Sequence, residues 1–146
     1  MTKLVAILED NPDRISEMRA CVQEALPTLQ AVFFVNAHEM ITWLKPNLPQ
    51  ISLISLDHDL PVISVNGRLV DCGDGRLVAS FLAEFPPTCP IIVHSSNDHC
   101  ATSMFHTLRD AGWPTTEIVP FDGHAWVRAA WMPQLLQLVR DGWIDP

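Results

Sequence analysis

Acidic side chains stand directly after two apolar segments of the sequence, 3–8 and 51–56. These carboxylates are Glu9, Asp10, Asp57 and Asp59. If the two segments are neighbouring parallel strands, their carboxyl ends meet at one edge of a sheet, and the carboxylates share one crevice. Two carboxylates about 4 Å apart repel each other by roughly 4 kcal/mol at an effective dielectric constant of about 20. A cation or a proton must therefore accompany them.

Several groups can supply this positive charge. A divalent cation is the simplest, because hard cations prefer carboxylate oxygens as ligands. The alternatives within the chain are protonated histidines and loop arginines, namely His58, His94, Arg68 and Arg76. Lys3 is excluded because it begins the first segment, about 20 Å from the carboxylates at roughly 3.3 Å per residue. A structural interpretation also stays open, in which the carboxylates cap the following helix or shape a turn.

Two histidines, His58 and His94, end expected strands that are neighbours in the sheet. An imidazole can bind a metal or transfer protons near neutral pH, although a single histidine at a strand end is more often a hydrogen-bonded structural residue. Ser95, Ser96 and Asn97 follow His94 and precede an expected helix. One of them is expected to be the N-cap, while free amides and hydroxyls at this point can bind a phosphate.

The elements that must position these residues alternate along the chain. Short apolar segments are followed by longer helical patterns, the arrangement that right-handed βαβ crossovers of a parallel sheet require. The expected strands are 3–8, 30–35, 51–56, 90–94 and 116–120. The expected helices are 12–26, 37–45, 75–85, 98–111 and 124–141. Pro133 predicts a kink near Met132, because a proline interrupts a regular helix.

This alternation predicts an α/β protein with a flavodoxin-like fold. We expect a five-stranded parallel sheet in the order 2-1-3-4-5, with helices on both faces, forming a single domain over residues 1–146. One long connection, 58–74, interrupts the pattern, and structureless loops beyond roughly 12 residues are uncommon and often functional. Asn66-Gly67 favours a tight turn, so residues 63–70 are expected to form a small hairpin there.

Composition narrows the class of protein. The 146 residues are 48% hydrophobic and 18% charged, which excludes a disordered acidic tail. No apolar run approaches the roughly 18 residues of a membrane span, and the apolar run near the start is too short for a signal peptide, so we expect a cytoplasmic protein. The net charge of −8 excludes duplex nucleic acid as a partner but permits a small phosphorylated ligand or nucleotide. The four cysteines form no C-x-x-C pair and are expected to be reduced thiols. The sequence identifies no protein partner.

The strand ends resemble those of a response-regulator receiver domain. The resemblance rests on Leu8-Glu9-Asp10-Asn11-Pro12 after the first strand, Asp57 after the third and Pro120-Phe121 after the fifth. The receiver family binds magnesium through the acidic pair and accepts a phosphoryl group on the third-strand aspartate. It also has a lysine directly before the Pro-Phe pair. This sequence has Val119 at that position, so the resemblance does not imply signalling by phosphotransfer.

Two segments resemble more closely a divergent branch, the cyclic-phosphate-processing receiver domains. They are Leu56-Asp57-His58-Asp59-Leu60 and His94-Ser95-Ser96-Asn97, which are similar to the LDHDL and H-S-x-N strand ends of that family. Asp98 and Cys100 differ from the proline and glycine that we expect there. The resemblance extends from Leu4 to about Trp113, and it implies a receiver-like fold and an activity on cyclic phosphates.

The residues and the resemblance together predict a metal-dependent phosphoesterase that processes cyclic-phosphate nucleotides or nucleic-acid ends. The expected ligands of Mg²⁺ or Mn²⁺ are Glu9, Asp10 and Asp57. The expected catalytic residues are His58 and His94, which transfer protons, and Asp59, which orients His58 or adds a ligand. The expected phosphate-binding residues are Ser95 and Asn97.

A second hypothesis is a non-catalytic pseudo-receiver that binds other proteins. Tryptophans gather in the last third of the sequence and can anchor a protein interface, although core packing explains most tryptophans better. They are Trp113, Trp126, Trp131 and Trp143.

Overall fold

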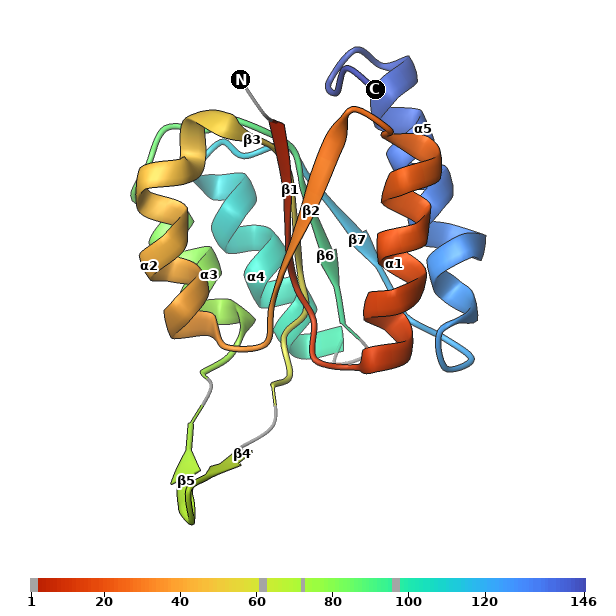
Figure 1. Cartoon of the computed structure of the whole chain (residues 1–146). Helices are drawn as coiled ribbons and strands as arrows, with labels where there is room; N and C mark the ends of the chain where they lie inside the picture. Colours follow the sequence, from red (N-terminus) through yellow and green to blue (C-terminus); the bar gives the residue numbers. More distant parts are fainter. Residues whose placement is uncertain (1–2, 61–62, 72, 96–97) are drawn as a thin grey trace.

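Five parallel strands form the central sheet, in the order β2-β1-β3-β6-β7 (Figure 1). They are β1 (Lys3–Leu8), β2 (Leu29–Phe34), β3 (Ile51–Leu56), β6 (Ile91–His94) and β7 (Thr115–Ile118). The structure is a computed structural model and describes residues 3–60, 63–71, 73–95 and 98–146. Because β4 and β5 lie outside this sheet, its order is the predicted 2-1-3-4-5, and the flavodoxin-like α/β fold is confirmed.

Helices cover both faces of the sheet. They are α1 (Pro12–Ala25), α2 (Ala37–Asn47), α3 (Gly75–Leu82), α4 (Asp98–Asp110) and α5 (Met132–Arg140), with a short 3₁₀ turn η1 (Leu48–Gln50) and a π turn η2 (Val127–Trp131). Helices α2, α3 and α4 lie on one face, and α1 and α5 lie on the other (Figure 1). Within the described part of the chain, no helix is both long enough and apolar enough to cross a membrane.

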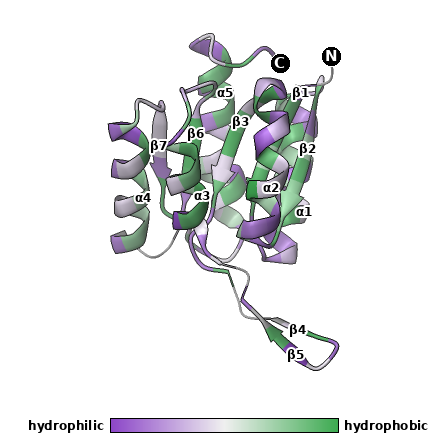
Figure 2. Cartoon of the chain, turned by 90° about the vertical axis from the view of Figure 1, so that its left-hand side faces the viewer, coloured by the Kyte–Doolittle hydropathy of each residue, from purple (hydrophilic) through white to green (hydrophobic). Residues whose placement is uncertain are grey.

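The core has two layers, one on each face of the sheet. Along β1, Leu4, Ala6 and Leu8 pack in the layer under α2, α3 and α4, whereas Val5 and Ile7 pack in the layer under α1 and α5. This alternation follows from the period of two in a strand. Since both faces are covered, the inner strands β1, β3 and β6 are mostly apolar, whereas the edge strand β7 has the sequence Thr-Thr-Glu-Ile (Figure 2).

Two of the cysteines that were predicted to be reduced pack in these core layers as free thiols. Cys21 is a buried thiol in the α1 layer, and Cys89 is a buried thiol in the α2–α4 layer. Cys72 lies outside the described residues. The cysteines that pack in the core therefore act there as small apolar side chains.

The last helical stretch is interrupted before Pro133, as predicted, and the interruption is a π turn. The Met132 N–H donates to the Val127 carbonyl, five residues earlier, and Pro133 then lies in the first turn of α5. A proline lacks the amide hydrogen of a regular helix, and its ring collides with the carbonyl four residues earlier. A wide turn at this point removes that conflict, and such turns are frequent at functional sites.

A hairpin projects from the carboxyl-end edge of the sheet, away from the body of the protein (Figures 1 and 2). Strands β4 (Ile63–Val65) and β5 (Arg68–Val70) pair in antiparallel fashion, with Val65 opposite Arg68. Asn66 and Gly67 both have positive φ, at 53° and 77°, as a type I′ turn requires. The hairpin predicted for residues 63–70 is therefore confirmed.

Candidate functional site

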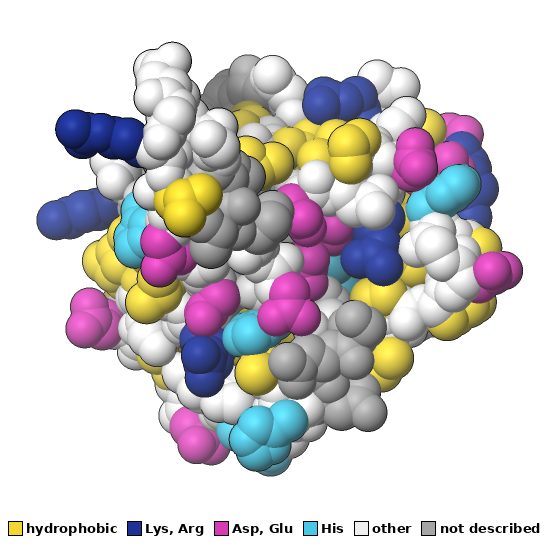
Figure 3. Space-filling view, turned by 90° about the horizontal axis from the view of Figure 1, so that it is seen from below, with side chains coloured by type: hydrophobic (Ala, Val, Ile, Leu, Met, Phe, Trp, Pro, Cys, Tyr) yellow, Lys and Arg dark blue, Asp and Glu magenta, His cyan; other side chains and the backbone are white. Residues whose placement is uncertain are grey.

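Three carboxylates meet at the carboxyl-end edge of the sheet. Strands β1 and β3 are neighbours in parallel register, with Leu8 opposite Leu56, so the residues that follow them emerge side by side. Glu9, Asp10 and Asp57 each offer an oxygen atom, and these three atoms lie within 4.8 Å of one another. We call this group the acidic cluster. Figure 3, which looks onto this end of the molecule, shows acidic side chains gathered near the middle of the face.

Helix capping does not explain the acidic cluster. The side chain of Asn11 caps α1, since its Oδ1 atom accepts the amides of Asp13 and Arg14 at 3.0 and 3.1 Å. The carboxylate of Glu9 points inward and is fully buried, and Asp57 is only 5% exposed. Buried carboxylates are retained where a cation, a proton or hydrogen bonds balance them.

Protein groups hold both oxygens of Glu9. The Oε2 atom lies 3.0 Å from His94 Nε2, and Oε1 accepts the Asn11 amide at 3.2 Å. Arg14 Nη1 lies 3.7 Å from the same Oε1 atom. Burial opposes ionisation of Glu9, but the His94 hydrogen bond, the Asn11 amide and the Arg14 charge together hold its pKa below the usual value. Glu9 is therefore the member of the acidic cluster whose ionised form its surroundings favour.

The other two carboxylates hold protons more tightly. Burial is the main cause that raises the pKa of Asp57 to about 7, and the neighbouring Glu9 and Asp10 charges add to it. Burial and the Glu9 charge likewise raise the pKa of Asp10. A divalent cation would reverse this preference, because it favours the ionised form of each carboxylate. The donor set, three hard oxygens in one place, fits such a cation.

His58 presents a buried ring nitrogen beside the acidic cluster. Its backbone amide donates to Asp57 Oδ1 at 2.7 Å, and its Nδ1 atom lies 2.6 Å from Asp59 Oδ1. An ionised carboxylate only accepts, so Nδ1 carries a proton. The Nε2 atom is buried and has no hydrogen-bond partner among the described residues, with Asp74 Oδ2 at 3.9 Å. This nitrogen is therefore available to a ligand or to a proton.

Helix α3 is docked directly against the end of β3. The Gly75 amide donates to the His58 carbonyl at 3.0 Å, and the side chain of Asp74 caps α3 by accepting the Arg76 amide. A Cβ atom on Gly75 would lie 2.1 Å from the Asp57 carbonyl oxygen. Only glycine permits this approach, which sets the position of the segment 57–59 relative to α3.

The structure places the other predicted residues as follows. Ser95 is buried directly after β6, whereas Asn97 and Ser96 lie outside the described residues. His94 is fully buried, and its ring nitrogens face Glu9 and Ser55, so it is placed to orient Glu9. Among the predicted catalytic residues, Asp59 is exposed, whereas His58 and His94 are buried.

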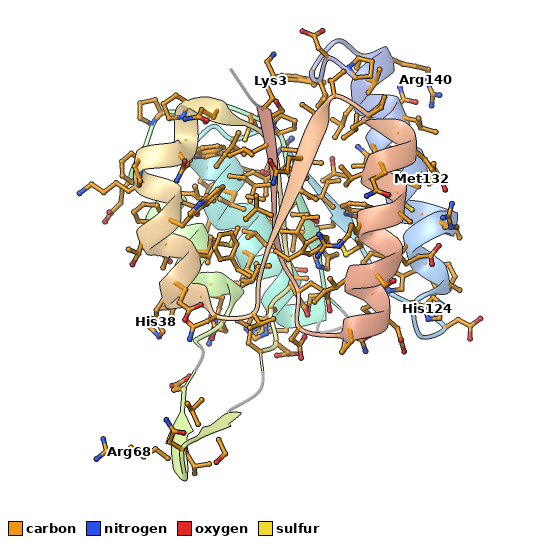
Figure 4. The ribbon with its side chains drawn as sticks, in the orientation of Figure 1. Lys3, His38, Arg68, His124, Met132 and Arg140 are labelled. Atoms are coloured by element: carbon orange, nitrogen blue, oxygen red, sulfur yellow. The ribbon has the colours of Figure 1, made fainter. Side chains whose placement is uncertain are left out.

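Of the alternative cations within the chain, His94 and His58 lie at the acidic cluster, whereas the two loop arginines have other positions. Arg68 is on the projecting hairpin, and Lys3 is at the opposite end of the molecule, as Figure 4 shows. Arg76 pairs with Asp74 at 3.3 Å. The cation that reasoning from the sequence missed is Arg14. Its position in the first turn of α1, four residues after Asp10, was the signal for it, because a first-turn side chain can reach back to the preceding strand end.

Three of the four tryptophans considered as interface anchors belong to the core. Trp113, Trp126 and Trp131 are buried, and Trp143 is 55% exposed. Trp126 stacks on the His94 ring, with 5.4 Å between the ring centroids. These tryptophans therefore support the interior of the fold, as the core-packing interpretation predicts.

Comparison with solved structures shows the fold of response-regulator receiver domains. The response regulator domain of Thermotoga maritima CheB has a TM-score of 0.66 at 17% identity, with 100% of each chain covered. The phosphorylated cyanobacterial phytochrome response regulator RcpA has a TM-score of 0.62 at 20% identity, covering 97% of this chain and 91% of that one. The Mn²⁺-bound form of the response regulator Rcp1 has a TM-score of 0.58 at 16% identity, covering 93% and 91%.

Comparison of sequences identifies the branch of this fold. No curated protein matches the chain. The profile of the cyclic-phosphate processing receiver domain matches residues 7–110, a range that includes the acidic cluster, His58 and His94. The resemblance read from the two strand-end segments is thereby confirmed. The chain belongs to the family of cyclic-phosphate processing receiver domains.

Proposed function

We propose that the chain is a metal-dependent phosphoesterase that processes cyclic phosphates on nucleotides or on nucleic-acid ends. The acidic cluster carries the proposal, because its three oxygens within 4.8 Å match the ligands that Mg²⁺ and Mn²⁺ prefer. Membership of a family named for cyclic-phosphate processing supports the substrate class. The Mn²⁺-bound form of Rcp1, which has the same fold, supports the metal.

Glu9, Asp10 and Asp57 would hold the cation. When bound, a divalent cation supplies positive charge for the phosphoryl oxygens and lowers the pKa of a water ligand. The chain prepares the ligands in different ways. Glu9 is ionised and held at both oxygens, whereas Asp57 must release the proton that its pKa of about 7 retains. Protons and metal therefore compete for Asp57 near neutral pH.

His58 would transfer protons during hydrolysis. Opening a cyclic phosphate breaks a P–O bond, so the leaving sugar oxygen gains a proton and the attacking water loses one. Asp59 fixes the proton of His58 on Nδ1, which leaves Nε2 as the nitrogen that exchanges protons. This is the arrangement expected of a general acid and base that a carboxylate orients.

His94 would position a ligand of the metal, and the residues that follow it would bind the phosphate. None of them would transfer a proton. His94 would position Glu9, because its ring nitrogens bond to Glu9 and Ser55. Ser95, buried after β6, and Asn97 would orient the phosphate, as the sequence predicts. Small hydroxyl and amide groups before a helix suit this role.

Hydrolysis of 2′,3′-cyclic nucleotides and of RNA oligonucleotides ending in a cyclic phosphate tests the proposal, with Mg²⁺ or Mn²⁺ present and chromatography of the products. His58→Asn should lower the rate on the order of 10²–10⁴-fold, the usual contribution of a positioned acid or base. His106→Asn is the matched control, because His106 is exposed on α4. No turnover by the metal-loaded wild type above buffer would refute the enzyme and favour a regulatory receiver module without catalysis.

A further inference from the structure

A row of buried hydrogen bonds leads from the acidic cluster to the last helical stretch. His94 Nε2 lies 3.0 Å from Glu9 Oε2, and His94 Nδ1 lies 2.7 Å from Ser55 Oγ. Trp131 Nε1 lies 3.0 Å from the same Ser55 Oγ. All four residues are fully buried. The row thus crosses from the end of β1 through β6 and β3 to the π turn η2.

With His94 as a neutral imidazole, the chemistry of the groups fixes the direction of every bond in this row. An indole nitrogen only donates, so Trp131 donates to Ser55. The ionised Glu9 only accepts, so His94 donates from Nε2. The Nδ1 atom of a neutral imidazole then accepts, and the Ser55 hydroxyl donates to it. For the neutral imidazole, one arrangement of hydrogens therefore satisfies all four side chains, and it holds His94 in the Nε2–H tautomer.

We propose that Ser55 and Trp131 are positioning residues of the metal site. Trp131 directs the Ser55 hydroxyl toward His94 Nδ1, and this contact keeps the His94 proton on Nε2, facing Glu9. Glu9 is held in turn with its carboxylate beside Asp10 and Asp57. The inference rests on the proposed function to the extent that the acidic cluster binds a divalent cation. Partners that orient a ligand in this way typically account for 10- to 100-fold in metal affinity.

Packing alone does not require these residue types. Ser55 lies in β3 between Ile54 and Leu56, in a strand whose other buried side chains are apolar, and an alanine or valine would continue that pattern. Trp131 ends the π turn, and the wider turn changes the direction of its side chain relative to a regular helix. The serine in an apolar strand and the tryptophan at the π turn meet at the Ser55 hydroxyl, next to His94.

Three variants of the full chain separate positioning from packing. Ser55→Ala removes the hydroxyl, and Trp131→Phe removes the indole N–H and leaves a smaller aromatic ring. Trp113→Phe is the matched control, because Trp113 is equally buried and its N–H donates to the Leu82 carbonyl at 3.0 Å, in the other core layer. All three lose one buried hydrogen-bonding group, and circular dichroism checks that each variant is folded.

Two measurements decide the proposal. Nitrogen-15 NMR of the histidine rings at pH 8 should show the Nε2–H tautomer for His94 in the wild type and a mixture of tautomers in Ser55→Ala. Calorimetric titration with Mn²⁺ should give a 10- to 100-fold weaker affinity for Ser55→Ala and Trp131→Phe, and an unchanged affinity for Trp113→Phe.

The outcomes distinguish this inference from the proposed function. An Nδ1–H tautomer in the wild type, or affinities of both variants within twofold of the wild type, would overturn the inference. Absence of Mn²⁺ binding by the wild type would overturn both. Mn²⁺ binding without hydrolysis of cyclic phosphates would overturn the enzyme alone, and the affinities of the variants would still decide whether Ser55 and Trp131 position the site.

Discussion

Replacing Asp57 with asparagine is expected to stabilise the metal-free protein above pH 7 and to change little near pH 4. Asp57 is 5% exposed, and burial raises its pKa from 3.8 to about 7. The folded protein thus retains a proton that the unfolded chain releases between about pH 4 and pH 7. The Asp57 contribution to the free energy of unfolding therefore falls as the pH rises through this window and is level above it. Asparagine does not titrate, so it removes the penalty.

The size of the effect follows from the difference between the two pKa values. One pH unit corresponds to about 1.4 kcal/mol, so the difference between 3.8 and about 7 gives about 4 kcal/mol at pH 8 as an upper value. Asparagine has nearly the same shape as aspartate. It also keeps the acceptor for the His58 amide, which donates to Oδ1 at 2.7 Å. The substitution therefore changes mainly the charge.

Urea unfolding between pH 4 and pH 8, with a chelator present, measures this difference. The comparison of wild type with Asp57→Asn at each pH largely cancels the contributions of the other titrating groups. Glu9→Gln is the control of opposite sign, because the pKa of Glu9 is lowered and its ionised form stabilises the fold above about pH 4.5. Asp57→Asn being less stable than wild type at pH 8 would refute the electrostatic reasoning.

Three further predictions concern the same edge of the sheet. Mg²⁺ or Mn²⁺ should raise the melting temperature of the wild type, by linkage worth about 2.7 kcal/mol at a hundredfold excess over Kd, and the Asp57→Asn variant should lose most of this shift in thermal scans. Acetyl phosphate should leave no stable phosphoryl group on Asp57, because Val119 stands in place of the receiver lysine; a persistent band in a phosphate-retaining gel would contradict this. Gly75→Ala should destabilise the fold by about 1–3 kcal/mol or more in urea unfolding, because its Cβ would overlap the Asp57 carbonyl, and unchanged stability would show that α3 is not docked so closely.

The strands and their order were predictable from the sequence, because a parallel sheet covered on both faces leaves continuous apolar segments. The residues at which the strands end were less predictable. The last strand was expected to extend over 116–120, and it ends at Ile118, with Val119 exposed in the connection that follows. An apolar residue after a strand carries no signal that distinguishes it from the strand itself. The π turn was likewise visible only as a break before Pro133.

The residues of the site were partly predictable, because acidic residues at neighbouring strand ends must meet once the strand order is known. The hydrogen-bond partners of these acidic residues were not predictable. Glu9 and His94 are 85 positions apart, and Ser55 and Trp131 are 76 positions apart. Contacts between residues so far apart in the sequence depend on the directions of side chains within a packed layer, and the periodicity of the sequence does not specify these directions. A serine inside an apolar strand was the only local sign of the row behind Glu9.

The chain between β3 and α3 leaves the body and returns to it at one point, where the Gly75 amide bonds to the His58 carbonyl at 3.0 Å. The hairpin therefore belongs to a loop whose two ends are already joined. The entropic cost of closing such a loop grows only slowly with its length. Insertions, deletions or a different structure can therefore replace the hairpin without moving the strands that carry the acidic cluster. The surface beside the acidic cluster can therefore vary while Glu9, Asp10 and Asp57 keep their positions.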